Sequence, residues 1–267
     1  MKQGITTHTI VRNEDRFVWF ALTAVARYVD RMLVFDTGST DETKEIINSI
    51  KNPKLIFAEK GKREAEELVG LRQQQIDRTD TEWFLILDGD EIWWEAAIKK
   101  VVHMANRLPQ NIWGIITPTI NCVGDIYHYQ EERAGRYEFG RKKGHYAVRA
   151  MRRNIRGLHV EGRYPLEGYF DSQGKPITKQ DNKLVFLDKP YLHVTNLKRS
   201  TKQQDRVIAR ERKYEVGIPF PANFRYPEVF YEKYPSCVPS PWTKMTKPEK
   251  LRSLLETPLK KVKRRIL

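Results

Sequence analysis

The sequence predicts an α/β fold in which helices flank a mostly parallel mixed sheet, followed by a helical appendage at the C-terminal end. Strand-like and helix-like segments alternate through residues 6–116. The strand segments are short and apolar, and acidic runs directly follow two of them. Repeated βα units of this size require a mostly parallel sheet with helices on both faces. Ligands of such sheets bind beyond the carboxyl ends of the strands, where both acidic runs lie.

The first units begin with a β-branched run over residues 6–12, which predicts a strand. Asn13 follows it as a candidate helix N-cap. Residues 17–28 place apolar side chains at the spacing of one helical face, which predicts a helix. The next expected elements are a strand, a helix and a strand at 32–35, 46–50 and 55–58.

A second group of units repeats this order. A predicted helix over 68–76 leads to the apolar run 83–87, which is typical of a strand covered on both faces. A helix at 97–105 and a strand at 113–116 complete the alternating part. Beyond Asn121 the alternation is lost, and only short strands are expected, at 145–151, 155–160, 184–187 and 191–194.

The composition changes again beyond Thr195, where bases, prolines and aromatic residues dominate. We expect a basic helix over 203–214, a Pro-rich aromatic stretch over 219–242 and a pair of terminal basic helices. Thr257 and Pro258 are typical of an N-cap and first helical position and would begin the second of that pair. The predicted organisation is a domain over 1–195, with halves 1–120 and 121–195, and a basic helical extension over 196–267.

The chain is strongly basic for its 267 residues. Lys and Arg number 48 against 34 Asp and Glu, so the formal net charge is +14. With 40% hydrophobic and 31% charged residues, the composition excludes a disordered chain and a coiled coil. The bases concentrate in segments 133–156 and 244–267. Such charge attracts phosphates of nucleotides, lipid head groups or nucleic acid, without selecting among them.

Cysteine usage and hydropathy indicate the compartment. Cys122 and Cys237 cannot by themselves form a disulfide framework or a four-ligand zinc site, which suggests a reducing environment. No segment approaches about 18 uninterrupted apolar residues, so we expect neither a spanning helix nor a signal peptide. We therefore expect a cytoplasmic protein whose contact with a membrane is peripheral, at the inner face of the cell membrane.

Two acidic runs follow predicted strands: Asp36 to Asp41 (DTGSTD) and Asp88-Gly89-Asp90-Glu91. Ionised groups at the edge of an apolar core are costly unless something compensates them. A divalent cation bound to a diphosphate would do so, and Mg²⁺ or Mn²⁺ commonly take one or two protein carboxylates. Gly89 lets the chain turn tightly and a phosphate approach. The alternative for this run is an ordinary Asp-Gly turn at a strand end.

Four motifs occur in a characteristic order: Val11-Arg12-Asn13-Glu14, the run from Asp36 to Asp41, Arg72-Gln73, and Leu87 to Glu91. Together they resemble the family 2 glycosyltransferases of the GT-A fold, strongly over residues 6–120 and loosely over 121–195. The resemblance implies a Rossmann-like GT-A domain. It also implies a nucleotide-diphosphate sugar donor, most often UDP-linked, lying over the first half of the sheet.

The resemblance also implies roles for individual residues. The donor-binding set would be Val11, Arg12, Asn13, Asp36, Thr37, Arg72, Asp88, Gly89 and Asp90. The implied metal ligands are Asp90, Asp88 and His193, although a core histidine is an equal interpretation of His193. Arg163 and Lys198 or Arg199 are candidate diphosphate partners. Thr37 stands where the family often has a second acid, so the base contact departs from the family pattern.

The segment 157–167 resembles the acceptor segment of the family. Inverting transfer needs a carboxylate to take the proton of the acceptor hydroxyl as its oxygen attacks the anomeric carbon. Glu161 and Glu167 are both candidates, and spacing alone does not separate them; Glu161 is preferred. The alternative for either residue is a surface ion pair with one of the nearby arginines.

These features predict a metal-dependent inverting glycosyltransferase that moves a sugar from a UDP-sugar to a hydroxyl acceptor. The expected acceptor is a glycan or a lipid-linked glycan in surface polysaccharide or lipopolysaccharide synthesis. One rival is a nucleotidyltransferase of similar fold, which usually carries a Gly-rich phosphate loop, whereas Gly4 is the one glycine before Asn13. A second rival is a non-catalytic basic nucleic-acid-binding protein, with steeply salt-dependent binding.

The terminal segment carries an apolar stripe flanked by bases. Such a basic amphipathic helix is typical of an element that lies on an anionic membrane surface. The alternative is a helix packed on its own domain or on a second subunit of a homodimer. The stripe comprises Leu251, Leu254, Leu255, Leu259, Val262 and Ile266.

Overall fold

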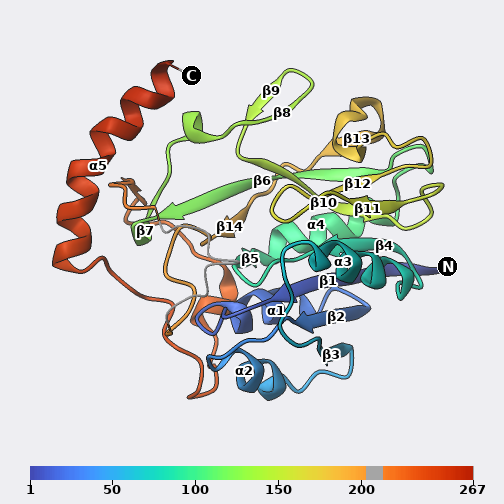
Figure 1. Ribbon diagram of the computed structural model, residues 1–267, viewed down its shortest axis with the longest axis horizontal. Helices are drawn as coiled ribbons and strands as arrows, with labels where there is room; N and C mark the ends of the chain where they lie inside the picture. Colours follow the sequence, from blue (N-terminus) through green and yellow to red (C-terminus); the bar gives the residue numbers. More distant parts are fainter. Residues whose placement is uncertain (203–212, 267) are drawn as a thin grey trace.

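The computed structural model describes residues 1–202 and 213–266 and contains a large mixed sheet with helices on both faces (Figure 1). The strands at one edge of this sheet lie in the order β3-β2-β1-β4 and are parallel. Helices α1, α2 and α3 connect them in sequence, so the predicted βα alternation is confirmed. Their bounds are β1 Lys2–Val11, α1 Val18–Ala26, β2 Arg31–Asp36, α2 Thr43–Ser49, β3 Leu55–Glu59, α3 Glu67–Asp77 and β4 Thr81–Ile86.

The second half of the sheet is mixed. After β5 (Glu91–Trp93) and α4 (Glu95–Ala105), the long strand β6 (Gly114–Val123) lies two places from β4. Strand β10 (Tyr146–Arg152) fills the place between them and is antiparallel to both. Strand β14 (Tyr191–His193) pairs with β5 and β6, and this pairing sets His193 opposite Glu91.

Several short elements complete the structure. Strands β11 and β12 pair with each other, as do β8 and β9, while β7, β13 and β15 join the large sheet. The remaining bounds are β7 Asp125–Tyr129, η1 Glu132–Ala134, β8 Tyr137–Phe139, β9 Lys142–Gly144, β11 His159–Glu161, β12 Gly168–Phe170, η2 Ile177–Lys179, η3 Asp181–Lys183, β13 Leu184–Phe186, β15 Ile218–Pro219, η4 Glu228–Tyr231 and α5 Lys247–Ile266.

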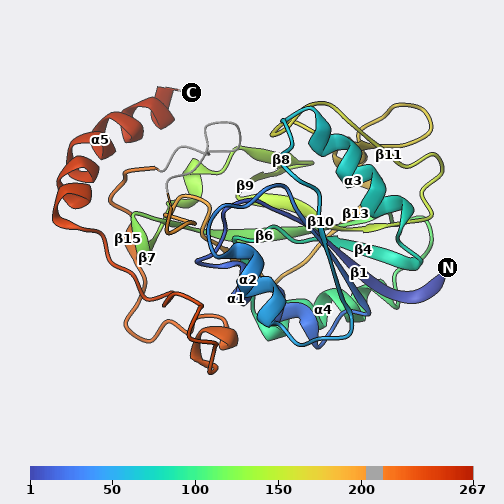
Figure 2. The same ribbon diagram turned by 60° about the horizontal axis from the view of Figure 1, so that its bottom comes forward.

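The core forms two main layers of apolar side chains, one on each face of the sheet. Helices α1, α2 and α4 cover one face and α3 covers the other (Figure 2). Along β4, Trp83 and Leu85 pack in the cluster that contains α1 and α4 residues, whereas Phe84 and Ile86 pack in the cluster that contains Ile76 of α3. Because successive side chains of a strand point to opposite faces, the uninterrupted apolar run fits a strand buried on both sides.

The prediction that Asn13 is a helix N-cap is wrong. Asn13 has a φ of 55°, and its Oδ1 accepts hydrogen bonds from the backbone N–H groups of Thr40 (2.8 Å) and Asp41 (3.4 Å). Phe17 occupies the cap position of α1 and makes no side-chain cap hydrogen bond. The Asn13 amide instead ties the end of β1 to the loop that follows β2.

The strand predicted over residues 155–160 is also wrong in its first part. Residues 153–157 form turns, Gly157 has a φ of 64°, and strand β11 starts at His159. Ile155 and Leu158 are buried in the α3-side cluster although neither lies in a strand. Their apolar character therefore reflects burial beneath the sheet rather than extended backbone.

The C-terminal segment forms one helix, not the predicted pair. Helix α5 continues through Pro258, and the hydroxyl of Thr257 donates to the carbonyl of Ser253 (2.5 Å) instead of capping a new helix. The basic helix expected over 203–214 falls mainly on residues 203–212, outside those described. No helix in the described segments is long and apolar enough to cross a membrane.

The Pro-rich stretch packs on the large core. Phe230 lies edge-on to Phe20 of α1, with ring centroids 5.1 Å apart, and Tyr234 contacts Trp19 (6.1 Å). Trp242 in turn stands edge-on to Phe230 (5.6 Å). The aromatic residues that follow Thr195 thus extend the core over α1.

Candidate active site

The carboxyl ends of β2, β1 and β4 meet at one edge of the sheet. Val11 pairs with Asp36, and the carbonyl of Val11 accepts hydrogen bonds from both the backbone N–H and the hydroxyl of Thr37, each 3.0 Å. On the other side of β1, the N–H of Leu87 donates to the carbonyl of His8 (3.0 Å). The two acidic runs therefore flank the end of β1, as parallel pairing requires.

Asp36 shapes the loop after β2. Its Oδ1 accepts hydrogen bonds from the backbone N–H groups of Gly38 and Ser39, both at 2.9 Å. Gly38 has a φ of 91°, and a Cβ there would lie 2.9 Å from the Cα of Lys62, so the turn needs glycine. The other oxygen, Oδ2, is buried and has no hydrogen-bond partner among the described residues. One Asp36 oxygen is thus used by the turn, and the other is buried beneath the strand ends.

A narrow cavity of about 70 Å³ opens at this edge. Six of the predicted donor-binding residues line it: Val11, Arg12, Thr37, Arg72, Asp88 and Asp90. The other three, Asn13, Asp36 and Gly89, do not line it. A Cβ at Gly89 would stand 3.1 Å from Val11 Cγ1 and 3.3 Å from Glu14 Cβ, so this glycine allows close packing below the cavity. The remaining lining residues are Ile10, Glu14, Leu68, Tyr164, Glu167 and Arg199.

Asp88 is held between two arginines. Arg72 Nη2 donates to Asp88 Oδ1 (2.9 Å), and Arg149 Nη2 reaches Asp88 Oδ2 (3.4 Å). Arg149 also bonds the buried carboxylate of Glu91 and donates from Nε to the Tyr191 hydroxyl (3.1 Å). Burial raises the pKa of Glu91 to about 8, and the charge of Arg149 opposes that rise. The arrangement orients Asp88 but directs both of its oxygens toward guanidinium groups.

Asp90 lies where β5 and β14 come together. His193 Nε2 stands 3.4 Å from Asp90 Oδ1, and Arg199 Nη1 stands 3.4 Å from Asp90 Oδ2 while bonding Glu14 Oε1 at 2.6 Å. The N–H of Val194 donates to the carbonyl of Asp90 (3.0 Å), which fixes the two segments together. A carboxylate oxygen suits both Mn²⁺ and Mg²⁺, whereas an imidazole nitrogen suits transition metals, so this pair fits Mn²⁺ better than Mg²⁺.

The described part of the chain contains no group of three or more His, Cys, Asp or Glu side chains arranged to hold a metal ion. A cation at Asp90 and His193 would therefore take its remaining ligands from substrate oxygens and water. Such sparse protein ligation is usual for Mg²⁺ at phosphate sites.

The two candidate bases occupy different surroundings. Glu161 lies on β11, its side chain is 58% exposed, and it pairs with His159 Nε2 at 2.8 Å. Glu167 lines the cavity, and its Oε2 is buried without a hydrogen-bond partner in residues 1–202 and 213–266. The structure brings Glu167, and not the preferred Glu161, to the residues at the strand ends.

The candidate diphosphate partners also differ in burial and in their distance from the cavity. Arg199 is buried and lines the cavity, whereas Lys198 is exposed. Arg163 pairs with Glu66 at 2.8 Å and is 69% exposed. Sequence analysis missed Arg149, which was counted only as part of a basic segment. Its signal was a base between the apolar residues Val148 and Ala150 of a predicted strand.

Comparison with known proteins identifies the family. The sequence model of Glycosyl transferase family 2 matches residues 7–161, more than half of the chain. The chain belongs to glycosyl transferase family 2. No curated protein sequence matches this family member.

One solved structure supports the GT-A fold, and a second is similar over a comparable share of the chain. Staphylococcus aureus TarS, residues 1–349 in complex with UDP-GlcNAc, aligns over 78% of this chain and 60% of its own, at 14% identity and a TM-score of 0.50. Glucosyl-3-phosphoglycerate synthase from Mycobacterium tuberculosis, in complex with Mn²⁺ and UDP-glucose, aligns over 72% of this chain and 71% of its own, at 14% identity and a TM-score of 0.44. The chain spans between 37% and 61% of the length of the TarS chains it matches.

Proposed function

We propose that this protein is a divalent-metal-dependent, inverting glycosyltransferase that moves a sugar from a UDP-sugar to a hydroxyl acceptor. Residues 1–195 would form the transferase domain and 196–267 an extension to it. One observation carries the proposal: a family 2 chain brings Arg12, Thr37, Arg72, Asp88 and Asp90 to one cavity at the ends of its parallel strands.

The cavity has the chemistry that a nucleotide diphosphate needs. Leu68 and Ile10 offer apolar wall for the base, and Arg12, Arg72 and Arg199 offer guanidinium groups that can bond phosphate oxygens. We favour UDP over other nucleotides because TarS and glucosyl-3-phosphoglycerate synthase, the two similar structures described above, contain UDP-sugars. A nucleotide sugar needs several hundred Å³, so side chains at the mouth of the cavity must move aside for it.

The metal would be held by Asp90 and His193. When bound, Mn²⁺ or Mg²⁺ supplies positive charge that stabilises the leaving diphosphate. Asp88, oriented by Arg72 and Arg149, would accept hydrogen bonds from the ribose or the donor sugar.

Glu167 is the proposed general base. Its carboxylate takes the proton of the acceptor hydroxyl while that oxygen attacks the anomeric carbon from the face opposite UDP. The bond from the anomeric carbon to the diphosphate oxygen breaks, and its electron pair leaves with UDP. A single displacement of this kind inverts the anomeric configuration. Burial lowers the pKa of Arg72, but the charges of Asp88 and Glu167 outweigh it, so the guanidinium keeps a raised pKa and remains charged throughout.

A nucleotide-binding test separates this proposal from the nucleic-acid-binding rival. UDP should raise the melting temperature in the presence of Mn²⁺, since a ligand that binds the native state stabilises it by mass action. Asp90→Asn should remove the Mn²⁺-dependent part of the shift, whereas Lys198→Ser, next to the site but exposed, should retain it. No shift with any nucleotide, together with salt-sensitive DNA or RNA binding, would support the nucleic-acid-binding rival instead.

We also propose that the acceptor belongs to surface polysaccharide or lipopolysaccharide synthesis and that α5 contacts an anionic membrane. Five of the apolar stripe residues are between 53% and 73% exposed, while Ser253 and Thr257 on the opposite face are buried. Arg252, Lys261 and Lys263 flank this stripe on the helix and complement anionic lipid head groups.

Sedimentation with vesicles tests the membrane contact. Wild-type protein should bind phosphatidylglycerol vesicles more than phosphatidylcholine vesicles, and Leu255→Ser/Leu259→Ser should weaken that binding because it removes exposed apolar area. Unchanged sedimentation would refute the membrane role. A concentration-dependent dimer that the same variant dissociates would assign the face to a second copy of the chain.

A further inference from the structure

A second, larger cavity of about 600 Å³ adjoins the candidate active site. One wall of this cavity lies next to Asp88, Asp90 and Glu91 of the candidate active site. It is formed by Arg149, Tyr191 and His193. Its other end is formed by the segment around Arg136 and by helix α5. This volume lies within the range of small-molecule sites and exceeds that of the narrow donor cavity.

The far end of this cavity is strongly basic. Arg136, Lys213, Lys260, Lys263 and Arg264 line it, and none of the residues that line it within the described chain is an Asp or a Glu. Lys260 and Arg264 are partly neutralised by ion pairs with Glu256 and Glu215 outside the cavity. Arg136 and Lys263 are exposed and take part in no hydrogen bond or ion pair with a described residue. Among the described residues that line the cavity, positive charge is therefore in excess.

We infer that this cavity takes an anionic acceptor, a sugar that carries a phosphate or carboxylate group in addition to the hydroxyl that is glycosylated. The inference rests on the proposed function, because it names the acceptor class of the same site. The accepting hydroxyl would lie at the His193 end, beside the donor, and the anionic group at the Arg136–Lys263 end. Both lysines and arginines bond phosphate and carboxylate oxygens strongly when the site is partly shielded from water.

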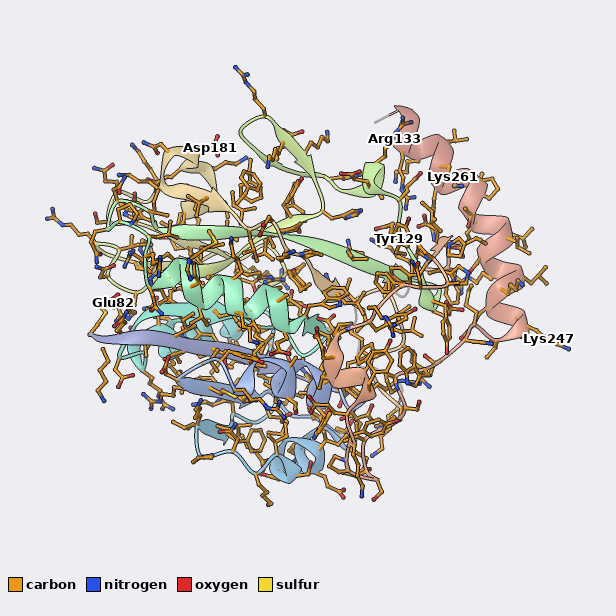
Figure 3. All side chains as sticks on the ribbon, turned by 180° about the vertical axis from the view of Figure 1, so that it is seen from behind. Glu82, Tyr129, Arg133, Asp181, Lys247 and Lys261 are labelled. Atoms are coloured by element: carbon orange, nitrogen blue, oxygen red, sulfur yellow. The ribbon has the colours of Figure 1, made fainter. Side chains whose placement is uncertain are left out.

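Helix α5 is essential to this cavity. It supplies Lys260, Lys263 and Arg264, and the Arg264–Glu215 and Arg264–Glu131 bonds (2.6 and 3.0 Å) hold it against the segment that carries Arg136. Figure 3 shows Arg133 near the end of α5 that carries Lys261. The extension thereby acts as an acceptor-recognition element as well as a surface helix.

Two double variants provide a matched test. Arg136→Ser/Lys263→Ser removes one charge from each side of the cavity, whereas Arg133→Ser/Lys261→Ser removes one charge from each of the same two segments without altering the lining. All four positions are exposed, so neither variant should unfold the protein. Binding of glucose 6-phosphate, glucuronate and neutral glucose is measured by calorimetry, with and without saturating UDP and Mn²⁺.

We expect wild-type protein and the Arg133/Lys261 variant to bind glucose 6-phosphate or glucuronate more tightly than glucose. The Arg136/Lys263 variant should bind the anion at least about tenfold more weakly, the loss expected for charge-assisted contacts. Comparison of the phosphate and the carboxylate tells which group the site prefers. Equal weakening in both double variants, equal binding of glucose, or no saturable binding of either anion would overturn the inference.

The UDP titration keeps the two proposals apart. A protein that binds UDP with Mn²⁺ but neither anion retains the proposed function and loses only the acceptor inference. A protein that binds the anions but not UDP has an anion site in this cavity, and the transferase function is then the part that fails.

Discussion

Replacing Arg264 by Met should release α5 from the rest of the protein. Arg264 donates to both carboxylate oxygens of Glu215, at 2.6 and 2.7 Å, and Glu215 has a side chain that is only 2% exposed. Burial opposes the ionisation of Glu215, but the hydrogen bonds and charge of Arg264 outweigh it and lower the pKa of that carboxyl. Without Arg264 a buried carboxylate loses the partner that stabilises its charge.

The magnitude follows from the geometry. Removing one partner of a buried ion pair costs about 3–5 kcal/mol, and the lower end applies because the Arg264 side chain is 13% exposed. The remaining contacts of α5 include hydrogen bonds from the Val216 N–H to Thr257 Oγ1 (2.8 Å) and from Lys260 Nζ to the Tyr214 carbonyl (2.6 Å), each contributing about 1 kcal/mol. The apolar stripe of α5 faces outward, so little hydrophobic burial compensates the loss.

Hydrogen exchange measures this effect directly. A loss of about 3 kcal/mol corresponds to a roughly 100-fold fall in the protection of amides in α5, with little change in β1 or β4. Arg252→Met is the control, since Arg252 forms an exposed i,i+4 pair with Glu256 that contributes little to stability.

A double variant tests whether the unpaired Glu215 carboxylate causes the loss of protection in α5. Glu215→Gln/Arg264→Met removes both charges and should recover part of the protection, because no ionised group is then left buried. The pair stabilises docking above the unfolded pKa of Glu215, near 4.5, and this contribution disappears as pH falls through the lowered folded pKa. Equal protection of α5 in the Arg264→Met and Arg252→Met variants at neutral pH would refute the reasoning.

Three further predictions concern the site and the sheet. Glu167→Gln should lower transfer by about 10²–10⁴-fold while UDP binding persists, and Glu161→Gln should change it little; the reverse order in a transfer assay would assign the base to Glu161. Asp90→Asn, or EDTA on wild-type protein, should abolish transfer while circular dichroism stays unchanged, and full activity in EDTA would exclude the metal role. Burial, reinforced by Arg72, lowers the pKa of His8 far below 6.5, so the unfolded chain takes up a proton that the folded chain does not. Stability should therefore fall below pH 6.5 by up to about 1.4 kcal/mol per pH unit. In urea titrations His8→Gln should flatten this fall, and an unchanged slope would show that another group is responsible.

The alternating half of the chain was predictable because its signals are local. Apolar residues at helical spacing mark α1, α3 and α4, and the apolar run that forms β4 marks a strand covered on both faces. The acidic runs follow β2 and β4, and parallel pairing on either side of β1 brings their positions together. The family and the donor-site residues that line the cavity followed from these same motifs.

The strand order in the second half of the chain could not be predicted, because it depends on pairing between strands that are far apart in the sequence. Strand β10 enters between β4 and β6 in the antiparallel sense, and β14 bridges β5 and β6. These strands are short, and their apolar residues resemble those of buried turns such as the one at Ile155. Arg149 gained its role only when β10 placed it beside Asp88 and Glu91.

The amino-acid order alone determined the βα framework, the two acidic strand ends and the amphipathic character of the terminal helix, since each arises from spacing between near neighbours. Only the tertiary structure decided that Glu167 rather than Glu161 reaches the cavity, that His193 stands beside Asp90, and that α5 turns its polar face inward. These outcomes depend on which segments far apart in the sequence pack together and on which charged side chains pair when they are buried. Neither property can be read from the spacing of residues along the chain.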